Sequence, residues 1–336
     1  MTNFFEVSKQ SLSSRARLGS VNTVHGEVKT PSFIFCGTKA TVKSILPQQL
    51  RSAKTQIILS NTYHLMLQPG PDIISKERGL QNFTQWRGPM MTDSGGYQIF
   101  SLGHGSVSEE IKGKNKNIKR KSLIKISEEG AIFRNYLNGD KVYLTPERSI
   151  ELQRHFGADL IFVLDECTPF NVSKKYTENS MYLSHRWAKR CSDAFKTTYS
   201  KFDSQSGSSG RQYLYGIIQG GVYDDLRKIA CEETCSGDYN GLAIGGSLGG
   251  SKEQMHDIFS FCSDLIDKSK PVHVLGIGGL DDILHGVSCG YDTFDCVSPT
   301  RIARHGIMLS RLSAKGINLN NSKFKNDHSF IDEECE

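Results

Sequence analysis

The feature that most limits how this chain can fold is a repeated unit, in which a short apolar run precedes a longer stretch with helical spacing. Eight such runs occur, at 32–36, 56–60, 89–92, 160–164, 213–218, 241–244, 272–275 and 293–297. They are continuously apolar rather than alternating, as expected of parallel strands that are buried on both faces. Plausible helices between the runs include 146–156, 176–197, 224–235, 252–268 and 281–288.

Eight strand–helix units predict a (β/α)8 barrel of the TIM type, and a doubly wound open sheet is the alternative. A length of 336 residues is compatible with one α/β barrel domain. We therefore expect a single catalytic barrel over residues 1–336, interrupted by a β-rich antiparallel insertion at 102–145. In this insertion a lysine-rich segment, 112–121, precedes alternating apolar residues and an Asn138-Gly139 hairpin signal.

Composition excludes several classes of protein. The longest apolar runs, such as 160–164, are far shorter than the ~20 residues that span a bilayer. The first residues lack the basic region and apolar stretch of a secretory signal. Nine cysteines are scattered singly, which favours a reducing compartment and predicts a cytoplasmic protein. A net charge of +5 permits a polyanionic partner without requiring one.

Polar and glycine residues follow the apolar runs, where a barrel builds its active site. They include Asp93 to Tyr97 after the third run, Asp165 after the fourth, Gln219 after the fifth, and Asp295 in the eighth. Neighbouring carboxylates in a partly dry pocket have pKa values that are pushed apart, which suits one for nucleophilic and another for acid/base work. Asp165 and Gln219 can read the edge of a purine-like base, and Tyr97 can stack on its face. A glycine-rich rim with capping aspartates is the structural alternative.

Six motifs resemble those of a known family. They are Asn61-Thr-Tyr-His-Leu65, Met91-Thr-Asp-Ser-Gly-Gly-Tyr-Gln-Ile-Phe100, Asp165-Glu-Cys-Thr-Pro169, Gly216-Ile-Ile-Gln-Gly-Gly221, Ala243-Ile-Gly-Gly246 and Phe294-Asp-Cys-Val-Ser-Pro-Thr-Arg301. In their order and spacing, from about Phe5 to Cys335, they resemble the bacterial-type tRNA-guanine transglycosylases (queuine tRNA-ribosyltransferases). The resemblance implies a (β/α)8 barrel and a pentosyltransferase. Such an enzyme exchanges guanine at wobble position 34 of tRNAs with GUN anticodons (Asp, Asn, His and Tyr tRNAs) for a 7-deazaguanine, on the route to queuosine.

The resemblance also implies residue roles. Asp295 matches the nucleophile that bonds covalently to the ribose, and Asp93 matches the general acid/base. The base-binding residues that it implies are Asp93, Ser94, Gly95, Gly96, Tyr97, Asp165, Gln219 and Gly246. The residues that it implies for contact with the anticodon loop are Gly276, Ile277, Gly278, Gly279, Leu280, Asp281, Asp282, Thr300, Arg301, Ile302, Ala303 and Arg304.

A structural zinc site and a homodimer are implied as well. The family closes with a C-x-C-x-x-C…H zinc motif, of which Asp332-Glu-Glu-Cys335 matches only the first cysteine. A tetrahedral zinc site takes four ligands. We therefore expect 311–336 to begin the zinc-binding region, with Cys335 as its one candidate ligand, as in a truncated form.

The stretch Gly245-Gly-Ser-Leu-Gly-Gly-Ser251 lacks the valine and glutamate that are usual in bacterial members of the family, whereas Cys167 is bacterial in type. A smaller side chain enlarges the pocket, and loss of the glutamate removes a partner for an aminomethyl cation. These residues favour queuine as the incoming base, with prequeuosine base as the alternative.

Other functions compete with this one. A non-catalytic RNA-binding subunit of the same fold has no need for both Asp93 and Asp295, and an inactive truncated form is a further possibility. An unrelated hydrolase or aldolase would carry a phosphate-binding loop where Arg301 and Arg304 occur here. An archaeosine-type enzyme is disfavoured because no additional RNA-binding domain follows the barrel.

Overall fold

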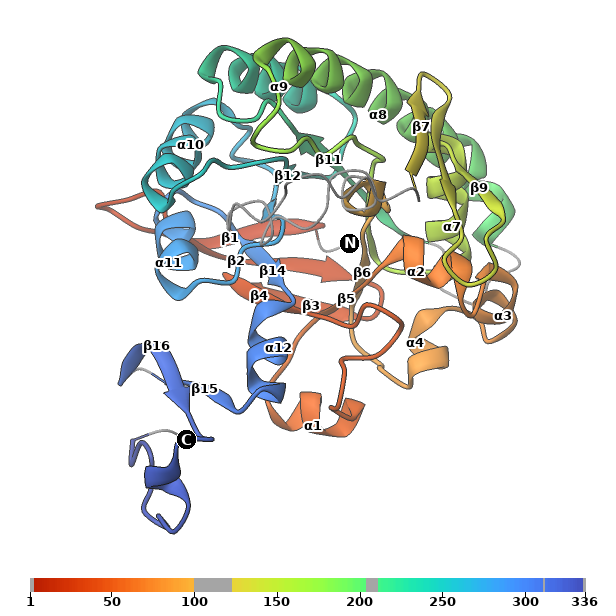
Figure 1. Cartoon of the computed structure of the whole chain (residues 1–336). Helices are drawn as coiled ribbons and strands as arrows, with labels where there is room; N and C mark the ends of the chain where they lie inside the picture. Colours follow the sequence, from red (N-terminus) through yellow and green to blue (C-terminus); the bar gives the residue numbers. More distant parts are fainter. Residues whose placement is uncertain (1–2, 100–122, 204–210, 311, 335–336) are drawn as a thin grey trace.

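The computed structural model describes residues 3–99, 123–203, 211–310 and 312–334, and a closed eight-stranded barrel lies at its centre (Figure 1). The strands, in their order around the barrel, are β4 (Ser32–Cys36), β5 (Ile58–Ser60), β6 (Met90–Thr92), β10 (Leu160–Phe162), β11 (Tyr213–Ile218), β12 (Gly241–Ile244), β13 (Val272–Val274) and β14 (Thr293–Cys296). Every neighbouring pair is parallel, including β14 with β4. The predicted barrel is therefore confirmed, and the open-sheet alternative is wrong.

Helices surround this barrel. The longer ones are α7 (Pro146–Phe156), α8 (Lys174–Asp203), α9 (Asp224–Ser236), α10 (Lys252–Leu265) and α11 (Leu280–Ser288). Short helices fill the first connections and follow the last strand, namely α1 (Pro47–Ser52), α2 (Thr62–Leu67), α3 (Pro71–Lys76), α4 (Leu80–Thr84) and α12 (Ser298–Arg304). The bounds of α7 match the prediction because its ends carry clear signals. Thr145 caps the first turn by accepting from the amide of Arg148, and Gly157 ends the helix with φ +70°.

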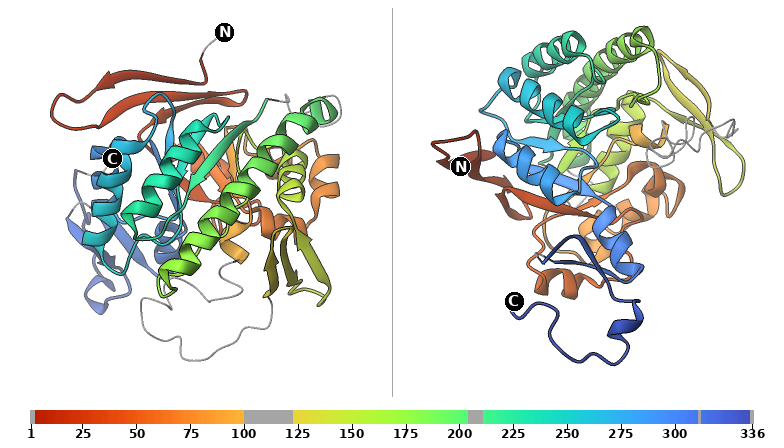
Figure 2. Two further views of the ribbon diagram at one scale, coloured as in Figure 1. Left: turned by 90° about the horizontal axis from the view of Figure 1, so that it is seen from above. Right: turned by 60° about the vertical axis from the view of Figure 1, so that its left-hand side comes forward.

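A three-stranded antiparallel sheet, which the sequence analysis did not anticipate, lies at the amino ends of the barrel strands (Figure 2). It consists of β1 (Phe5–Gln10), β2 (Arg17–Thr23) and β3 (Gly26–Thr30). Arg17 forms a buried ion pair with Asp292, the residue before β14, at 2.7 Å. His25 contacts Asp159, the residue before β10, at 2.8 Å. Both contacts anchor the sheet at the end of the barrel opposite the predicted site.

A second antiparallel sheet follows β6 and contains β7 (Leu123–Ser127), β8 (Gly130–Arg134) and β9 (Lys141–Leu144). Asn138-Gly139 lies in the β8–β9 connection, where Gly139 has φ +81°. The lysine-rich segment 112–121 lies outside the described residues. After α12 the chain forms the hairpin of β15 (Ile307–Ser310) and β16 (Ser313–Asn318), then the short 3-10 helix η1 (Ser322–Phe324).

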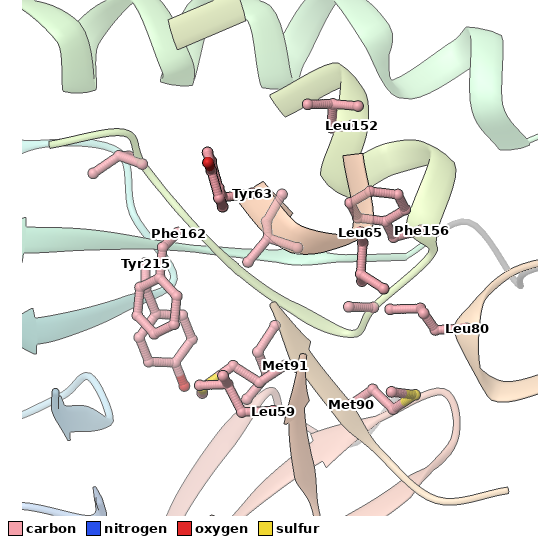
Figure 3. Packing of buried hydrophobic residues seen from close by; sticks show 14 of the residues in the cluster. Leu59, Tyr63, Leu65, Leu80, Met90, Met91, Leu152, Phe156, Phe162 and Tyr215 are labelled. Carbon is pink, nitrogen blue, oxygen red and sulfur yellow. The ribbon is translucent and has the colours of Figure 1, made fainter. Parts of the chain in front are cut away.

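The core explains why short apolar runs suffice as strands. Met90 and Met91 of β6 are both fully buried. Their side chains point to opposite faces of the sheet, as successive strand residues do (Figure 3). Inside the barrel the rings of Phe162 and Tyr215 meet edge to face, with centroids 5.5 Å apart. Burial of one such side chain contributes about 1.5–3 kcal/mol.

No helix in the described part of the chain is long and apolar enough to cross a membrane.

Candidate active site

The carboxyl ends of the barrel strands bring the predicted site residues to one rim. Asp93 follows β6 directly, Gln219 follows β11 directly, and Asp295 lies within β14. Asp165 comes three residues after the end of β10, and Gly246 comes two residues after β12. Because all these strands are parallel, the five residues lie at the same end of the barrel.

Asp93 is held by the beginning of helix α2. The amide of Thr62 donates to its Oδ1 at 2.8 Å, and the side-chain amide of Asn61 donates to its Oδ2. The Thr62 hydroxyl also donates to the Asp93 carbonyl at 2.5 Å. Burial raises the pKa of Asp93 to about 7, against the lowering effect of the Thr62 amide, and the charge of Asp295 adds to the rise. Asp93 can therefore both give and take a proton near neutral pH.

Asp165 is a second carboxyl group in an unusual environment. Gln219 Nε2 donates to its Oδ2 at 2.5 Å, and the Ser94 hydroxyl lies 3.4 Å from its Oδ1. Burial raises the pKa of Asp165 to about 6, although both hydrogen bonds act in the opposite direction. Gln219 Oε1 is a buried acceptor with no hydrogen-bond partner among the described residues. This pair thus presents a carboxyl group and an amide oxygen to the donors of a ligand.

Glycines let the backbone approach this pair. A Cβ at Gly96 would collide with Asp165 Oδ1, and a Cβ at Gly246 would collide with Gln219 Oε1. Gly246 also has φ +77°, a conformation that favours glycine. Two separate loops therefore pack their backbone directly against the carboxyl and amide groups, with no room for a side chain at either glycine.

Asp295 is 9% exposed, and each of its oxygens meets a different set of donors. Oδ1 contacts His273 Nε2 at 3.1 Å and accepts from the amide of Gly276 at 2.9 Å. Oδ2 accepts only from the Cys36 thiol, with an Sγ–Oδ2 distance of 3.5 Å, among the contacts of the described residues. Gly276 has φ +76°, which directs its amide at the carboxylate.

Comparison with known proteins identifies the family of this chain. The family described as "Queuine tRNA-ribosyltransferase" matches residues 11–336. The chain belongs to this family. A protein of that name from Roseiflexus sp. (strain RS-1) is 40% identical over 339 residues, covering 100% of this chain and 85% of the relative. One from Protochlamydia amoebophila (strain UWE25) is 40% identical over 336 residues, covering 100% and 84%. One from Bacillus subtilis (strain 168) is 41% identical over 334 residues, covering 99% and 79%.

The remaining base-binding candidates of this queuine tRNA-ribosyltransferase family member surround Asp93 in the sequence. Ser94 is buried, and its hydroxyl accepts from the amide of Gly96 at 3.2 Å. Gly95 has φ +90° and turns the chain into the helical residues 96–99. Tyr97, in the same segment, is 44% exposed.

The residues expected to contact the anticodon loop occupy two segments beside Asp295. The first, Gly276 to Asp282, connects β13 to the first turn of α11, and the second, Thr300 to Arg304, lies in α12. Arg301 and Arg304 are exposed. Asp282 differs from the two arginines because it is buried. Its Oδ1 lies 3.0 Å from Nε2 of His256, so its carboxylate already contacts a side chain of the protein. Thr300 is also buried, and its carbonyl accepts from Arg304 at 2.9 Å.

No group of three or more His, Cys, Asp or Glu side chains that could hold a metal occurs among the described residues. Cys335, the zinc ligand expected from the sequence, lies outside them. The residues present in the described part therefore do not fit a structural zinc site, which needs four ligands.

Sequence reasoning missed three residues that support the site. His273 and Cys36, inside apolar strands, contact the carboxylate of Asp295. Arg227 of α9 is fully buried and donates to the carbonyls of Gly221 at 2.7 Å and Gly245 at 3.0 Å. It therefore ties the loop after β11 to the loop after β12. The one available sequence signal for His273 is its position as a polar residue between the two valines of β13. This signal becomes informative only once the register with β14 is known.

Proposed function

We propose that this chain catalyses the exchange of guanine at wobble position 34 of tRNA for a 7-deazaguanine, as a tRNA-guanine transglycosylase of the queuosine modification route. Membership of the queuine tRNA-ribosyltransferase family supports a transferase that acts on tRNA. The observation that carries the proposal is the position of Asp93 and Asp295 at one barrel rim, each in a different environment. Both groups are needed for double displacement, and neither is needed for RNA binding alone.

In the first half-reaction Asp295 is the nucleophile. One of its carboxylate oxygens attacks C1′ of the ribose, and the bond between C1′ and N9 of guanine breaks. Asp93 in its protonated form supplies the proton that the departing guanine takes up. A pKa of about 7 suits Asp93 for this step because both of its protonation states are populated near neutral pH.

In the second half-reaction the incoming 7-deazaguanine gives its N9 proton to the ionised Asp93. N9 then attacks C1′, and the ester bond between C1′ and Asp295 breaks. Both carboxyl groups return to their starting protonation states, so protons and bonds balance over the cycle. A pair of carboxyl groups with these two roles is also how retaining glycosidases hydrolyse their substrates.

Recognition of the base is assigned to Asp165, Gln219 and Gly246. The raised pKa of Asp165 and the unpaired Gln219 Oε1 support this assignment, because buried polar groups need partners that a purine-like edge supplies. Tyr97 is proposed to stack on the base. A nucleotide that leaves its stack needs a site with little side-chain bulk, and Gly95 and Gly96 add no side chains beside Asp93.

The tRNA is proposed to contact the two segments beside Asp295, chiefly through Arg301 and Arg304. Guanidinium groups bind phosphates and stack on unpaired bases, the two features that a splayed anticodon loop offers. The proposed substrates are the Asp, Asn, His and Tyr tRNAs, whose anticodons have the sequence GUN. Exchange measured on anticodon stem-loops that differ only at positions 34 and 35 tests this selection.

Queuine is the proposed incoming base. The support is the glycine-rich stretch that follows β12, Gly245 to Ser251, which lacks the valine and the glutamate that are usual in bacterial members of the family. Displacement of labelled guanine from tRNA by queuine or by prequeuosine base, compared at equal concentrations, decides between them. Equal or faster displacement by prequeuosine base refutes the proposal.

Three further properties are proposed, two of them on the family resemblance alone. They are a homodimer, a cytoplasmic location and a zinc-binding C-terminal region that includes Cys335. The location has additional support, because all eight cysteines among the described residues are free. Light scattering after gel filtration measures the oligomeric state. Zinc analysis of the purified wild-type chain and of Cys335→Ser tests the metal, because equal zinc content in both excludes Cys335 as a ligand.

The main test is trapping of the covalent intermediate. Wild-type protein incubated with an anticodon stem-loop that contains guanine at position 34 is expected to give an RNA adduct on a denaturing gel. Asp295→Asn should give none, whereas Asp93→Ala should retain RNA binding and lose most turnover. Asp238→Asn, an exposed change near the end of α9, is the matched control and should behave as wild type. A normal adduct with Asp295→Asn would mean that another residue is the nucleophile.

A further inference from the structure

A histidine lies directly behind the proposed nucleophile. His273, the middle residue of β13, is 0% exposed and points into the barrel, where its ring lies 5.5 Å from that of Phe162. Nε2 of His273 is 3.1 Å from Asp295 Oδ1, and Nδ1 is 2.9 Å from the hydroxyl of Thr293. The two contacts use both ring nitrogens, so the orientation of the ring is fixed.

The strand register explains why one ring reaches both residues. His273 is the direct neighbour of Thr293 in the β13–β14 pair. Asp295 lies two residues further along β14, so its side chain shares a face with that of Thr293. The contact between His273 and Asp295 is therefore built from regular barrel geometry rather than from a loop.

Acceptor and donor roles determine which tautomer this arrangement needs. An ionised carboxylate can only accept, so Nε2 of His273 must carry the hydrogen. In a neutral ring Nδ1 is then an acceptor, to which the hydroxyl of Thr293 can donate. Thr293 thereby selects the tautomer that donates to Asp295, in the way that the partner of one ring nitrogen commonly sets the role of the other.

We propose that His273 is a positioning residue that, together with the Gly276 amide, binds Oδ1 of Asp295 and leaves Oδ2 as the oxygen that attacks C1′. This inference rests on the proposed function. Two N–H groups donate to Oδ1, whereas Oδ2 meets only the long contact from the Cys36 thiol among the described residues. A thiol is a weak donor, so Oδ2 keeps its lone pairs available.

The consequence concerns the rate at which Asp295 attacks C1′. A carboxylate that rotates freely presents its attacking oxygen in the productive geometry for a small fraction of the time. Two donors on one oxygen remove that rotation before the RNA binds, and misplacement of a reacting group by about 1 Å can cost about 100-fold in rate. The same donors receive the negative charge when the ester bond to C1′ breaks, so both half-reactions benefit.

Two amide substitutions separate positioning from a purely structural role. In His273→Gln the side-chain amide nitrogen can reach the place of Nε2, so the donor to Asp295 is retained. In His273→Asn the shorter amide reaches only the place of Nδ1, so contact with Thr293 is retained and contact with Asp295 is lost. Both changes put one amide in the barrel interior, so they are matched in polarity.

The assay is single-turnover formation of the covalent RNA adduct at saturating stem-loop RNA, with RNA affinity and the thermal midpoint measured on the same samples. We expect His273→Gln to form the adduct near the wild-type rate and His273→Asn to form it at least about tenfold more slowly, with RNA affinity unchanged in both. Equal adduct rates for the two variants would overturn the inference. So would an effect of His273→Asn on RNA affinity without an effect on rate.

If His273→Asn does not fold, the residue that selects the tautomer provides the same test. Thr293→Ser keeps the hydroxyl group and Thr293→Val removes it at nearly the same volume. A slower adduct with Val than with Ser supports the inference, and equal rates refute it. Absence of any adduct with the wild-type protein would instead refute the proposed function, so the two failures are distinguishable.

Discussion

Replacement of Asp93 by asparagine should stabilise the folded protein at alkaline pH. Burial raises the pKa of Asp93 from its ordinary value of 3.8 to about 7. Because the pKa in the folded state lies above that in the unfolded chain, the stability contributed by the protonated carboxyl group is complete below about pH 4. It is lost as the pH rises through about 7. Above that pH the wild-type protein keeps an ionised carboxylate in a site that disfavours it.

The magnitude follows from the size of this shift. One pKa unit corresponds to about 1.4 kcal/mol, so complete ionisation of Asp93 costs about 4 kcal/mol. Asparagine avoids this cost but cannot accept from both donors that face the carboxylate, namely the amide of Thr62 and the side chain of Asn61. A lost hydrogen bond costs about 1 kcal/mol. Asp93→Asn should therefore gain about 3 kcal/mol at pH 8.5 and lose about 1 kcal/mol below about pH 4.

Urea unfolding of wild type and Asp93→Asn at a series of pH values measures the difference directly. Fluorescence and far-UV circular dichroism should give coincident transitions, which justifies a two-state free energy. The difference in unfolding free energy between the two proteins should change sign and level off above about pH 8. A difference that does not vary with pH would refute the reasoning, because it would mean that the Asp93 carboxyl group titrates alike in the folded and unfolded chain.

Three other substitutions test the support of the site. Arg227→Met leaves several loop carbonyls without their donor, at a cost of about 1–3 kcal/mol for each buried group, so it should lower the urea midpoint strongly. Lys228→Met, at the exposed neighbouring residue, is the control and should leave the midpoint unchanged. Gly276→Ala places its Cβ in open space but forces alanine to φ +76°, at a cost of about 1–2 kcal/mol; its covalent adduct should form more slowly at unchanged RNA affinity. Gly246→Ala puts a methyl group on Gln219 Oε1 and should raise KM for guanine without weakening tRNA binding.

The barrel was predictable because its strands are buried on both faces, so each appears as an uninterrupted apolar run bounded by polar residues. The amino-terminal sheet lacks that signal. In β1 five of the six residues are exposed, and β2 buries only alternate positions, starting with Arg17. Its position depends on Arg17 and His25, which bind carboxylates more than a hundred residues away in the sequence. A pattern of local periodicity contains no information about such partners.

The site residues also fall into those that the sequence predicts and those that it does not. Asp93 and Gln219 were identifiable because each directly follows an apolar run, and the barrel topology converts that position into a place on the rim. His273 lies inside a run and resembles an ordinary core residue until the pairing of β13 with β14 aligns it with Thr293 and Asp295. Arg227 is hidden for a related reason, because arginine in a helix is normally exposed. Residues proposed to act on the ligand were visible in the sequence, whereas residues proposed to act through another side chain required the register.

The environments of the two aspartates provide an argument for their separate roles that does not depend on motifs. Asp93 has a pKa of about 7 and receives donors on both oxygens, so it is suited to exchange a proton while remaining fixed in place. Asp295 receives two N–H donors on one oxygen and only a thiol on the other, so a single oxygen is left for bond formation. Exchange of the roles would require Asp93 to give up a donor from Asn61 or Thr62 before it could attack. The structure therefore favours Asp295 as the group that bonds to ribose and Asp93 as the group that moves the proton.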